Sequence, residues 1–150
     1  MNELTVINSL ANEDKQYIVF LINKEYFGID VEHINSIIQM PKISMVPNGP
    51  EYLLGMTSVR DRVIPIVSLH KKMNYGEDKI TSESRVIIIN LKNDEMIGVV
   101  VDEVIEVTKI SNDEIQEASP FVSTDDSFIS GVGKKEDNLI SIFEVSTLIA

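Results

Sequence analysis

The feature that most constrains the fold of this chain is its excess of isoleucine and valine. The 150 residues include 22 Ile and 16 Val, together 38, against 9 Leu and 3 Ala. β-branched side chains lose rotamer freedom in a helix and pack well on the pleated surface of a sheet. Strong helix formers are correspondingly scarce. The composition therefore predicts a mainly β protein.

Short apolar runs separated by polar clusters predict individual strands. The polar cluster Lys92–Glu95 predicts a tight turn between two of these runs. Pro65 lies inside another run and predicts an edge or a bulge there, because proline cannot donate to a strand ladder. The runs that we interpret as strands are Tyr17–Ile22, Phe27–Val31, Val63–Leu69, Val86–Leu91, Ile97–Val101 and Leu139–Val145.

Helical signals are few and short. The isoleucines of Ile34–Ile38 fit one helical turn, and Ile37 with Ile38 fits the beginning of a strand equally well. Proline before Glu51–Leu54, with Gly55 after it, predicts another single turn. Ser111–Glu114 matches a capping box, whose turn must end before Pro120. We expect a few short helical turns in a fold built of strands.

The chain also contains an internal duplication. Residues 52–69 align with residues 128–145 without a gap, at a constant offset of 76. The earlier part of each copy matches as well, with Gly28 over Gly98 and one insertion. The identical pairs at the offset of 76 are Gly55/Gly131, Asp61/Asp137, Ile64/Ile140 and Ile66/Ile142.

The duplication predicts the domain organisation. We expect one domain over residues 16–150, built of two similar β subdomains at about 16–70 and 85–149. A polar linker at about 71–84 joins them, and residues 1–15 form an N-terminal extension that can be disordered. Short strands at close spacing are typical of small barrels or sandwiches.

Charge and cysteine content exclude several classes of function. The chain has 13 Lys+Arg against 24 Asp+Glu, a net charge of −11, which argues against nucleic acid or an anionic membrane surface as the partner. It has no cysteine, which excludes disulfides, a thiol nucleophile and thiolate metal sites. No apolar run is long enough to span a bilayer. We expect a cytoplasmic protein without direct membrane insertion.

Common enzyme motifs fail on inspection. The segment Gly131–Glu136 begins like a dinucleotide-binding loop, but a glutamate occupies the position of the third glycine. The two histidines, His33 and His70, are far apart in sequence, and we expect both at the surface or its boundary rather than in catalysis. We therefore predict no catalytic, cofactor-binding or metal-binding residue.

Two pairs of carboxylates keep an alternative open. Asp102 with Glu106, and Glu114 with Glu117, are spaced closely enough in sequence for acid–base chemistry. Solvated charges on strand edges and turns are the favoured interpretation, because surface carboxylates are common. A small acidic cytosolic enzyme that uses a carboxylate pair is the alternative function.

The segment Gly55–Leu69, GMTSVRDRVIPIVSL, resembles the Gly…Asn-Leu-Arg-Gly…Ile-Pro-Val-Ile-Asp-Leu segment of the CheW family. The resemblance extends over about residues 16–149, and the order and spacing of its elements make it specific. The other matching elements are Tyr26–Val31, Ile43–Pro47, Ile97–Val104 and Ile129–Val132.

This resemblance implies a fold and a function. The family fold is a pair of five-stranded SH3-like barrels that share a hydrophobic core. CheW proteins are non-enzymatic adaptors of bacterial chemotaxis that need no cofactor. They bind the regulatory domain of the histidine kinase CheA and the cytoplasmic tip of chemoreceptors. The implied location is the cytoplasm, with recruitment to membrane-associated receptor arrays. The kinase contact is barrel against barrel and implies strand-end residues of both subdomains.

The resemblance also implies a receptor-binding site. The family's receptor groove lies between the subdomains, where a helical hairpin docks, and its aliphatic anchors and rim arginine are typical of helix-in-groove recognition. Arg60 falls on the family's arginine, and plain core positions are the alternative for the two isoleucines. The implied site residues are Gly55, Val59, Arg60, Ile34, Ser36 and Ile37.

The chain departs from the family pattern around this arginine. Ser58 and Asp61 replace the family's Asn and Gly, and Ser36 stands where many relatives have Glu. Asp61 can partly neutralise Arg60, so these departures bear on partner choice and affinity. We expect Arg60 to be functional and Arg62 to be a solvated residue of a hairpin tip.

Overall fold

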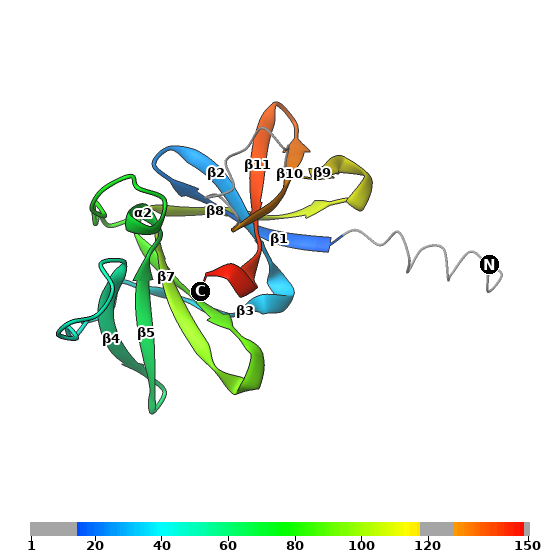
Figure 1. Ribbon diagram of the computed structural model, residues 1–150. Coiled ribbons are helices and arrows are strands. Elements are labelled where there is room, and N and C mark those ends of the chain that lie inside the picture. Colours follow the sequence, from blue (N-terminus) through cyan, green and yellow to red (C-terminus); the bar gives the residue numbers. More distant parts are fainter. Residues whose placement is uncertain (1–14, 118–127, 149–150) are drawn as a thin grey trace.

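The computed structural model describes residues 15–117 and 128–148, which form two curved sheets (Figure 1). The larger sheet has six strands in the order β8-β1-β2-β11-β10-β9, and we call it the six-stranded barrel. Its strands are β1 (Lys15–Ile22), β2 (Glu25–Asp30), β8 (Glu103–Ile110), β9 (Ile115–Glu117), β10 (Ile129–Lys135) and β11 (Asn138–Phe143).

The second sheet has five strands in the order β3-β6-β7-β5-β4, and we call it the five-stranded barrel. The mainly β fold in two barrels is thus confirmed, although one barrel has one strand more than expected. All six predicted apolar runs are strands. The strands of the smaller barrel are β3 (Ile34–Gln39), β4 (Leu53–Val59), β5 (Arg62–Ser68), β6 (Arg85–Asn90) and β7 (Met96–Val101).

Helical elements are short, as expected. The capping box of Ser111 and Glu114 is confirmed, and the turn predicted at Lys92–Glu95 is present. The helical turn predicted at Glu51–Leu54 is wrong, because a turn closed by the Pro50 carbonyl leads directly into β4. The elements are η1 (Val31–His33), α2 (Leu69–Lys72), η2 (Lys92–Asp94), η3 (Asn112–Glu114) and η5 (Val145–Thr147).

The duplication appears in the pairing register. The offset of 76 carries β4 onto β10 and the start of β5 onto the start of β11. In the six-stranded barrel Ile142 lies opposite Gly28, and in the five-stranded barrel Ile66 lies opposite Gly98. Both pairs join parallel strands, so the same junction is built twice. A residue from β2 to β3 therefore has its equivalent 70 positions later in the second half. A residue of β4 or β5 has its equivalent 76 positions later, so the two halves can be compared position by position.

The two halves exchange their first hairpins. Hairpin β1–β2 pairs with β8 and β11 of the second half, whereas β6–β7 pairs with β3 and β5 of the first half. The division predicted at 16–70 and 85–149 therefore follows the duplicated sequence and not the sheets. A strand pair can complete either barrel, because the two repeats offer equivalent apolar edges.

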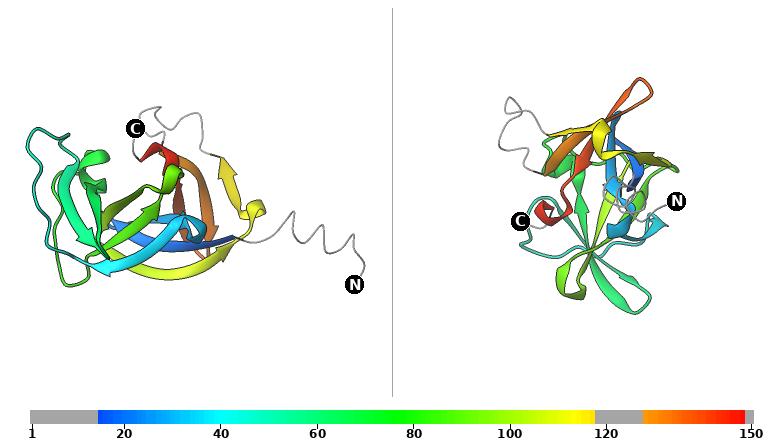
Figure 2. Two further views of the ribbon diagram at one scale, coloured as in Figure 1. Left: turned by 90° about the horizontal axis from the view of Figure 1, so that it is seen from below. Right: turned by 90° about the vertical axis from the view of Figure 1, so that its right-hand side faces the viewer.

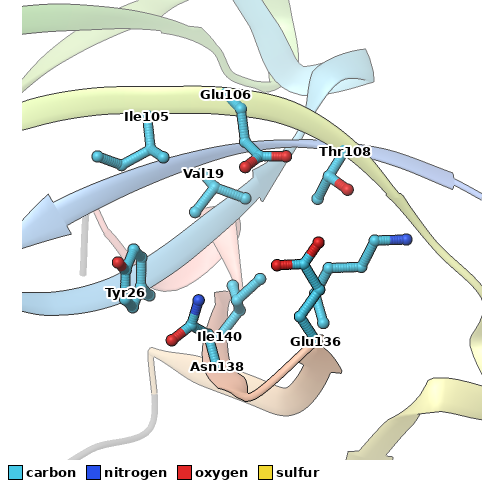
Figure 3. A pocket seen from close by; sticks show the side chains of 9 residues that line it. Val19, Tyr26, Ile105, Glu106, Thr108, Glu136, Asn138 and Ile140 are labelled. Carbon is cyan, nitrogen blue, oxygen red and sulfur yellow. The ribbon is translucent and has the colours of Figure 1, made fainter.

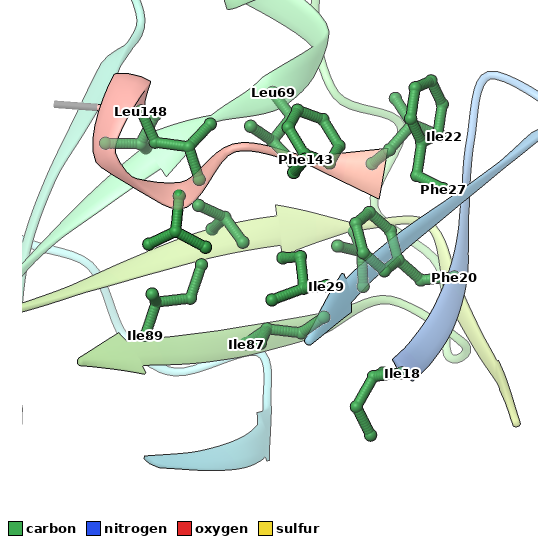
Figure 4. Packing of buried hydrophobic residues seen from close by; sticks show 14 of the residues in the cluster. Ile18, Phe20, Ile22, Phe27, Ile29, Leu69, Ile87, Ile89, Phe143 and Leu148 are labelled. Carbon is green, nitrogen blue, oxygen red and sulfur yellow. The ribbon is translucent and has the colours of Figure 1, made fainter. Parts of the chain in front are cut away.

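The exchange produces one core between the barrels and one inside each barrel. Along β1, Ile18, Phe20 and Ile22 face the shared core, while Tyr17 and Val19 face the interior of the six-stranded barrel. Figure 4 shows the shared core, where Phe20 stacks with Phe27 and with Phe143, and the last two rings are tilted against each other. The turn η5 covers this core near the C-terminal end (Figure 2). Strands buried on both faces need apolar residues at every position. This explains the uninterrupted apolar runs of the sequence.

Pro65 does not mark an edge strand, because β5 lies between β7 and β4. Pairing with β7 begins only at Ile66, however, so Pro65 has a strand neighbour on one side, at Met56. The bulge in this hairpin lies between Leu53 and Gly55 of β4. The missing N–H of proline is tolerated here because the strand is locally one-sided.

Candidate functional site

Arg60 stands at the tip of the β4–β5 hairpin. Val59 pairs with Arg62, so Arg60 and Asp61 are the two turn residues, with φ of 49° and 66°. Two positive φ values define a type I′ turn, which matches the twist of the strands but strains residues other than glycine. The turn leaves Arg60 exposed, and its guanidinium forms no hydrogen bond or ion pair with the part of the chain that the structure describes.

Arg62 connects this tip to the neighbouring turn. Its Nη2 donates to the Asp94 carbonyl oxygen at 2.5 Å, and its Nη1 lies 3.6 Å from the Asp94 carboxylate. Arg62 is exposed at the hairpin tip, as expected, and it also binds the neighbouring turn. The turn between β6 and β7 comes close enough to supply acceptors, and Arg62 holds the two tips together.

Ile34 and Ile37 lie on the side of β3 that faces the shared core. Ile34 pairs with Ile89 and Ile37 with Ile87, and residues opposite each other in a ladder share a face. Both partners belong to the shared core, and Ile34 packs against it. Ile37 is 37% exposed. β3 therefore presents an aliphatic face at the boundary between core and solvent.

Ser36 and Val59 belong to the other side of the sheet. Ser36 pairs with Ile88, and Val59 packs against the cluster inside the five-stranded barrel to which Ile88 belongs. The side chain of Val59 thus lies beneath the hairpin tip. These two residues support the site from inside and do not extend the face of Ile34 and Ile37.

Gly55 has a backbone role. It is buried beside the β4 bulge with a φ of +149°, and a Cβ there would clash with the carbonyl oxygen of Ser44. The close approach lets Ser44 and Met56 exchange two backbone hydrogen bonds of 2.8 Å. The fold itself therefore requires glycine at this position, whatever binds nearby.

The hairpin tip and the aliphatic face lie at the same end of the five-stranded barrel. Ile34 begins β3 beside the last residues of β6, and Asn35 Nδ2 donates to Asn90 Oδ1 at 3.4 Å. The β6–β7 turn follows at once, and Arg62 binds that turn at Asp94. The structure thus brings Arg60 and Ile34 to one end of the barrel, while Gly55 lies at the opposite end of β4.

Comparison with known proteins agrees with this architecture. The family model described as "CheW-like domain" matches residues 16–150. The chain belongs to the CheW-like domain family. It is 32% identical to the chemotaxis protein CheW of Bacillus subtilis over 136 residues, which cover 90% of this chain and 86% of that protein.

Further relatives give the same picture. The chain is 28% identical to the chemotaxis protein CheW of Helicobacter pylori over 134 residues, covering 89% of this chain and 81% of that protein. The crystal structure of the scaffolding protein TtCheW from Thermoanaerobacter tengcongensis superposes with a TM-score of 0.81 at 28% identity. That match covers 88% of this chain and 85% of TtCheW. The resemblance to the CheW family is confirmed.

His70 of this CheW-like domain is buried, and the expectation of a surface or boundary position is wrong. It is 5% exposed, at the start of α2, and its Nε2 lies 2.8 and 3.0 Å from the two carboxylate oxygens of Asp102. The Asn23 backbone N–H donates to the same carboxylate at 2.8 Å. This bonded partner makes burial of the imidazole possible. The sequence gives no signal for it, because the three residues are far apart along the chain.

The candidate carboxylate pairs do not form sites. Asp102 binds His70 and Asn23, whereas Glu106 lines a separate pocket of the six-stranded barrel. Glu114 accepts from the Ser111 backbone N–H at 3.0 Å, as a capping residue. In residues 15–117 and 128–148 no group of three His, Asp or Glu side chains is arranged to hold a metal ion. The same residues contain no helix of the length and apolarity needed to cross a bilayer.

Two ionisable side chains away from the hairpin tip have shifted pKa values. Burial raises the pKa of the Tyr17 phenol, and the Asp30 carboxylate raises it further. Burial lowers the pKa of Lys72, whose Nζ lies 4.5 Å from the centre of the Tyr52 ring. Both shifts follow from packing around the two barrels. Neither group lies on the hairpin tip or on β3.

Proposed function

We propose that this chain is a non-enzymatic chemotaxis adaptor that couples the cytoplasmic tips of chemoreceptors to the histidine kinase CheA. Membership of the CheW-like domain family and similarity to a scaffolding protein of that family support the proposal. The carboxylates that an enzyme would use are engaged in structural hydrogen bonds at Asp102 and Glu114, so the carboxylate enzyme has no support.

The receptor surface consists of Arg60 with the aliphatic face of Ile34 and Ile37. The observation that carries this assignment is the Arg60 guanidinium, which a type I′ turn holds in solvent without a partner among the described residues. An amphipathic helix recognised in a groove needs apolar anchors and a polar group at the rim. β3 supplies the anchors, and the hairpin tip supplies the rim charge. Val59 and Ser36 shape this end of the barrel from within, and Gly55 maintains the opposite end of β4.

The kinase contact is barrel against barrel, through strand ends of both barrels. Two modest interfaces on one adaptor reinforce each other, since the first contact raises the effective concentration for the second. An adaptor of this kind acts in the cytoplasm, where it is recruited to membrane-associated receptor arrays. It requires no cofactor.

The test is the substitution Arg60→Ala. We expect receptor binding to weaken by roughly tenfold or more, because arginine is among the residue types that dominate binding energy at interfaces. Stability should change by no more than about 0.5 kcal/mol, because the side chain touches nothing in the described fold. Co-sedimentation with receptor-containing vesicles and CheA measures the binding, and urea unfolding measures the stability.

The matched control is Lys134→Ala, which removes an exposed cation beside the equivalent hairpin tip of the other barrel. This variant should bind receptors as the original chain does. Equal binding by all three proteins would refute the assignment of Arg60. A tenfold loss in both variants would show that net charge, and not the hairpin tip, controls binding.

A further inference from the structure

A small pocket opens into the six-stranded barrel between β8 and the β10–β11 turn. Its volume is about 100 Å³. The inner wall is apolar and belongs to the barrel core, where Val19 and Ile140 are each 3% exposed. The ring of Tyr26 and the side chain of Ile105 complete the apolar wall (Figure 3). The pocket thus offers a narrow aliphatic channel that ends at the core.

The mouth of the pocket carries acceptor groups that lack partners. Figure 3 shows Glu106, from β8, and Glu136, from the β10–β11 turn, on opposite sides of the cavity, with Thr108 beside them. Thr108 is 8% exposed. None of these three side chains forms a hydrogen bond or ion pair with the part of the chain that the structure describes. The Thr108 hydroxyl opens onto the pocket, so it and the two carboxylates together offer unoccupied acceptors to a ligand.

The nearest lysine of the chain does not fill the pocket. Lys135 lines its rim, and its Nζ donates to the Lys109 carbonyl oxygen at 3.2 Å. The carboxylates therefore face an opening that no cation of the described residues neutralises.

The other barrel shows that the fold does not impose this pocket. Ile38 and Val59 occupy the positions equivalent to Thr108 and Lys135, and both pack against the core of the five-stranded barrel. Ser36 and Arg60 stand where Glu106 and Glu136 stand here. In the five-stranded barrel this place is filled by side chains and carries an arginine. In the six-stranded barrel it is hollow and acidic.

We propose that this pocket is a socket for a lysine side chain of a partner protein. The aliphatic stem of lysine matches the channel along Val19 and Ile140. Its ammonium carries three donors and no acceptor, which suits the two carboxylates and the Thr108 hydroxyl. An arginine fork is larger and planar, and it presents five donors. The net charge of −11 favours approach of a basic surface. The socket goes beyond the proposed receptor contact and does not depend on it.

The experiment is an NMR titration of the full-length chain with three capped tripeptides. Their central residue is lysine, arginine or norleucine, and their flanking residues are glycine. We expect the lysine peptide to bind saturably with a Kd in the millimolar range, roughly 1–10 mM, as one side chain allows. The methyl signals of Val19 and Ile140 and the amide of Thr108 should shift. Norleucine lacks the ammonium and should produce no saturable shift.

Three variants test which side chains of the pocket bind the lysine ammonium. Glu106→Gln and Glu136→Gln should each weaken binding of the lysine peptide by about tenfold, because charge-assisted hydrogen bonds are lost. Thr108→Val should weaken it less, about threefold, since one neutral hydrogen bond is removed. Glu117→Gln, an exposed glutamate of β9 outside the pocket, is the control and should bind as the original chain does.

Three results would overturn the socket. Equal binding of norleucine and lysine would show an apolar contact only. Unchanged lysine binding in the double variant Glu106→Gln with Glu136→Gln would place the cation elsewhere. Tighter binding of arginine than of lysine would contradict the assignment to lysine. The three glutamates are exposed and Thr108 is buried, and the rest of each variant's spectrum reports whether its fold is intact.

Discussion

The two barrels share a backbone plan and differ in the side chains placed upon it. Both have a bulge beside a buried glycine, at Gly55 and Gly131, and both join parallel strands at a glycine. Tyr17 stands inside the six-stranded barrel where Val86 stands in the five-stranded one. The comparison teaches that glycines and apolar runs maintain the repeated frame. Polar residues at equivalent positions give each barrel its own properties.

The largest expected effect tests the shared frame. Gly55→Ala should destabilise the protein by about 3 kcal/mol, because it combines a positive φ with a clash against the Ser44 backbone. In Gly131→Ala the new Cβ would lie 2.8 Å from the Gln116 carbonyl oxygen without the unfavourable φ. That variant should lose about 1–2 kcal/mol. Urea unfolding of both variants measures the difference.

A reversed order of these two losses would contradict the equivalence of the bulges. Receptor binding of any folded Gly55→Ala protein should remain within about threefold of the original, because the residue lies away from the hairpin tip. A selective loss of binding with unchanged stability would instead give Gly55 a direct role at the receptor surface.

The second test concerns a bond that only one half contains. His70 binds Asp102, whereas the equivalent residues are Ser146 and Glu32, and Ser146 donates to Glu144 instead. His70→Gln should destabilise the chain by about 2 kcal/mol, since it weakens a buried contact to a carboxylate. His33→Gln, in the exposed η1 turn, should change stability by less than about 0.5 kcal/mol.

A double-mutant cycle sharpens this test. Asp102→Asn combined with His70→Gln should cost less than the sum of the two single losses, because both remove the same interaction. Additive losses in urea unfolding would show that the two side chains act independently. Hydrogen exchange in β1 and β2 should also quicken in each variant, because Asp102 binds the Asn23 amide of their turn.

The smallest expected effect is a dependence on alkaline pH that belongs to the six-stranded barrel. Burial and Asp30 raise the pKa of Tyr17 above its ordinary value of 10.0. Unfolding exposes a phenol that ionises more readily, so Tyr17 stabilises the fold fully below about pH 10 and loses this contribution as pH rises through its folded-state pKa. The Tyr17→Phe variant should therefore lose less stability between pH 9 and 11 than the original chain does.

Urea unfolding at a series of pH values measures this slope. The comparison is between the slopes and not between the stabilities at neutral pH, where loss of the hydroxyl has its own effect. Identical slopes for Tyr17→Phe and the original chain would show that the alkaline sensitivity arises from another group.

Much of the fold could be predicted because its strands are buried on both faces. Continuous runs such as Val86–Leu91 cannot be solvated, and the turn at Lys92–Glu95 separates two of them clearly. The duplication at an offset of 76 predicted two similar β subdomains, and the structure repeats the bulge and the hairpin in both barrels. The exchange of hairpins could not be predicted, since equivalent repeats make each pairing equally compatible with the pattern.

The candidate site could be predicted only in part. The resemblance identified Arg60, and the exposed type I′ tip agrees with a binding role that remains to be tested. It could not separate Gly55, which the backbone requires, from residues free to bind a partner. The bonds of Arg62 and His70 depend on segments brought together by folding, and no local sequence pattern predicts them.

The exchange of hairpins also has a consequence for synthesis of the chain on the ribosome. Among the described strands, hairpin β1–β2 is made first, and its neighbours β8 and β11 follow only after β3–β7 have been made. Neither sheet can be completed from the first half alone, and such distant pairing slows folding. A nascent chain must therefore keep this apolar hairpin unpaired until β8 has been made. The arrangement that gives the protein one shared core thus delays completion of either barrel until strands of both halves have been made.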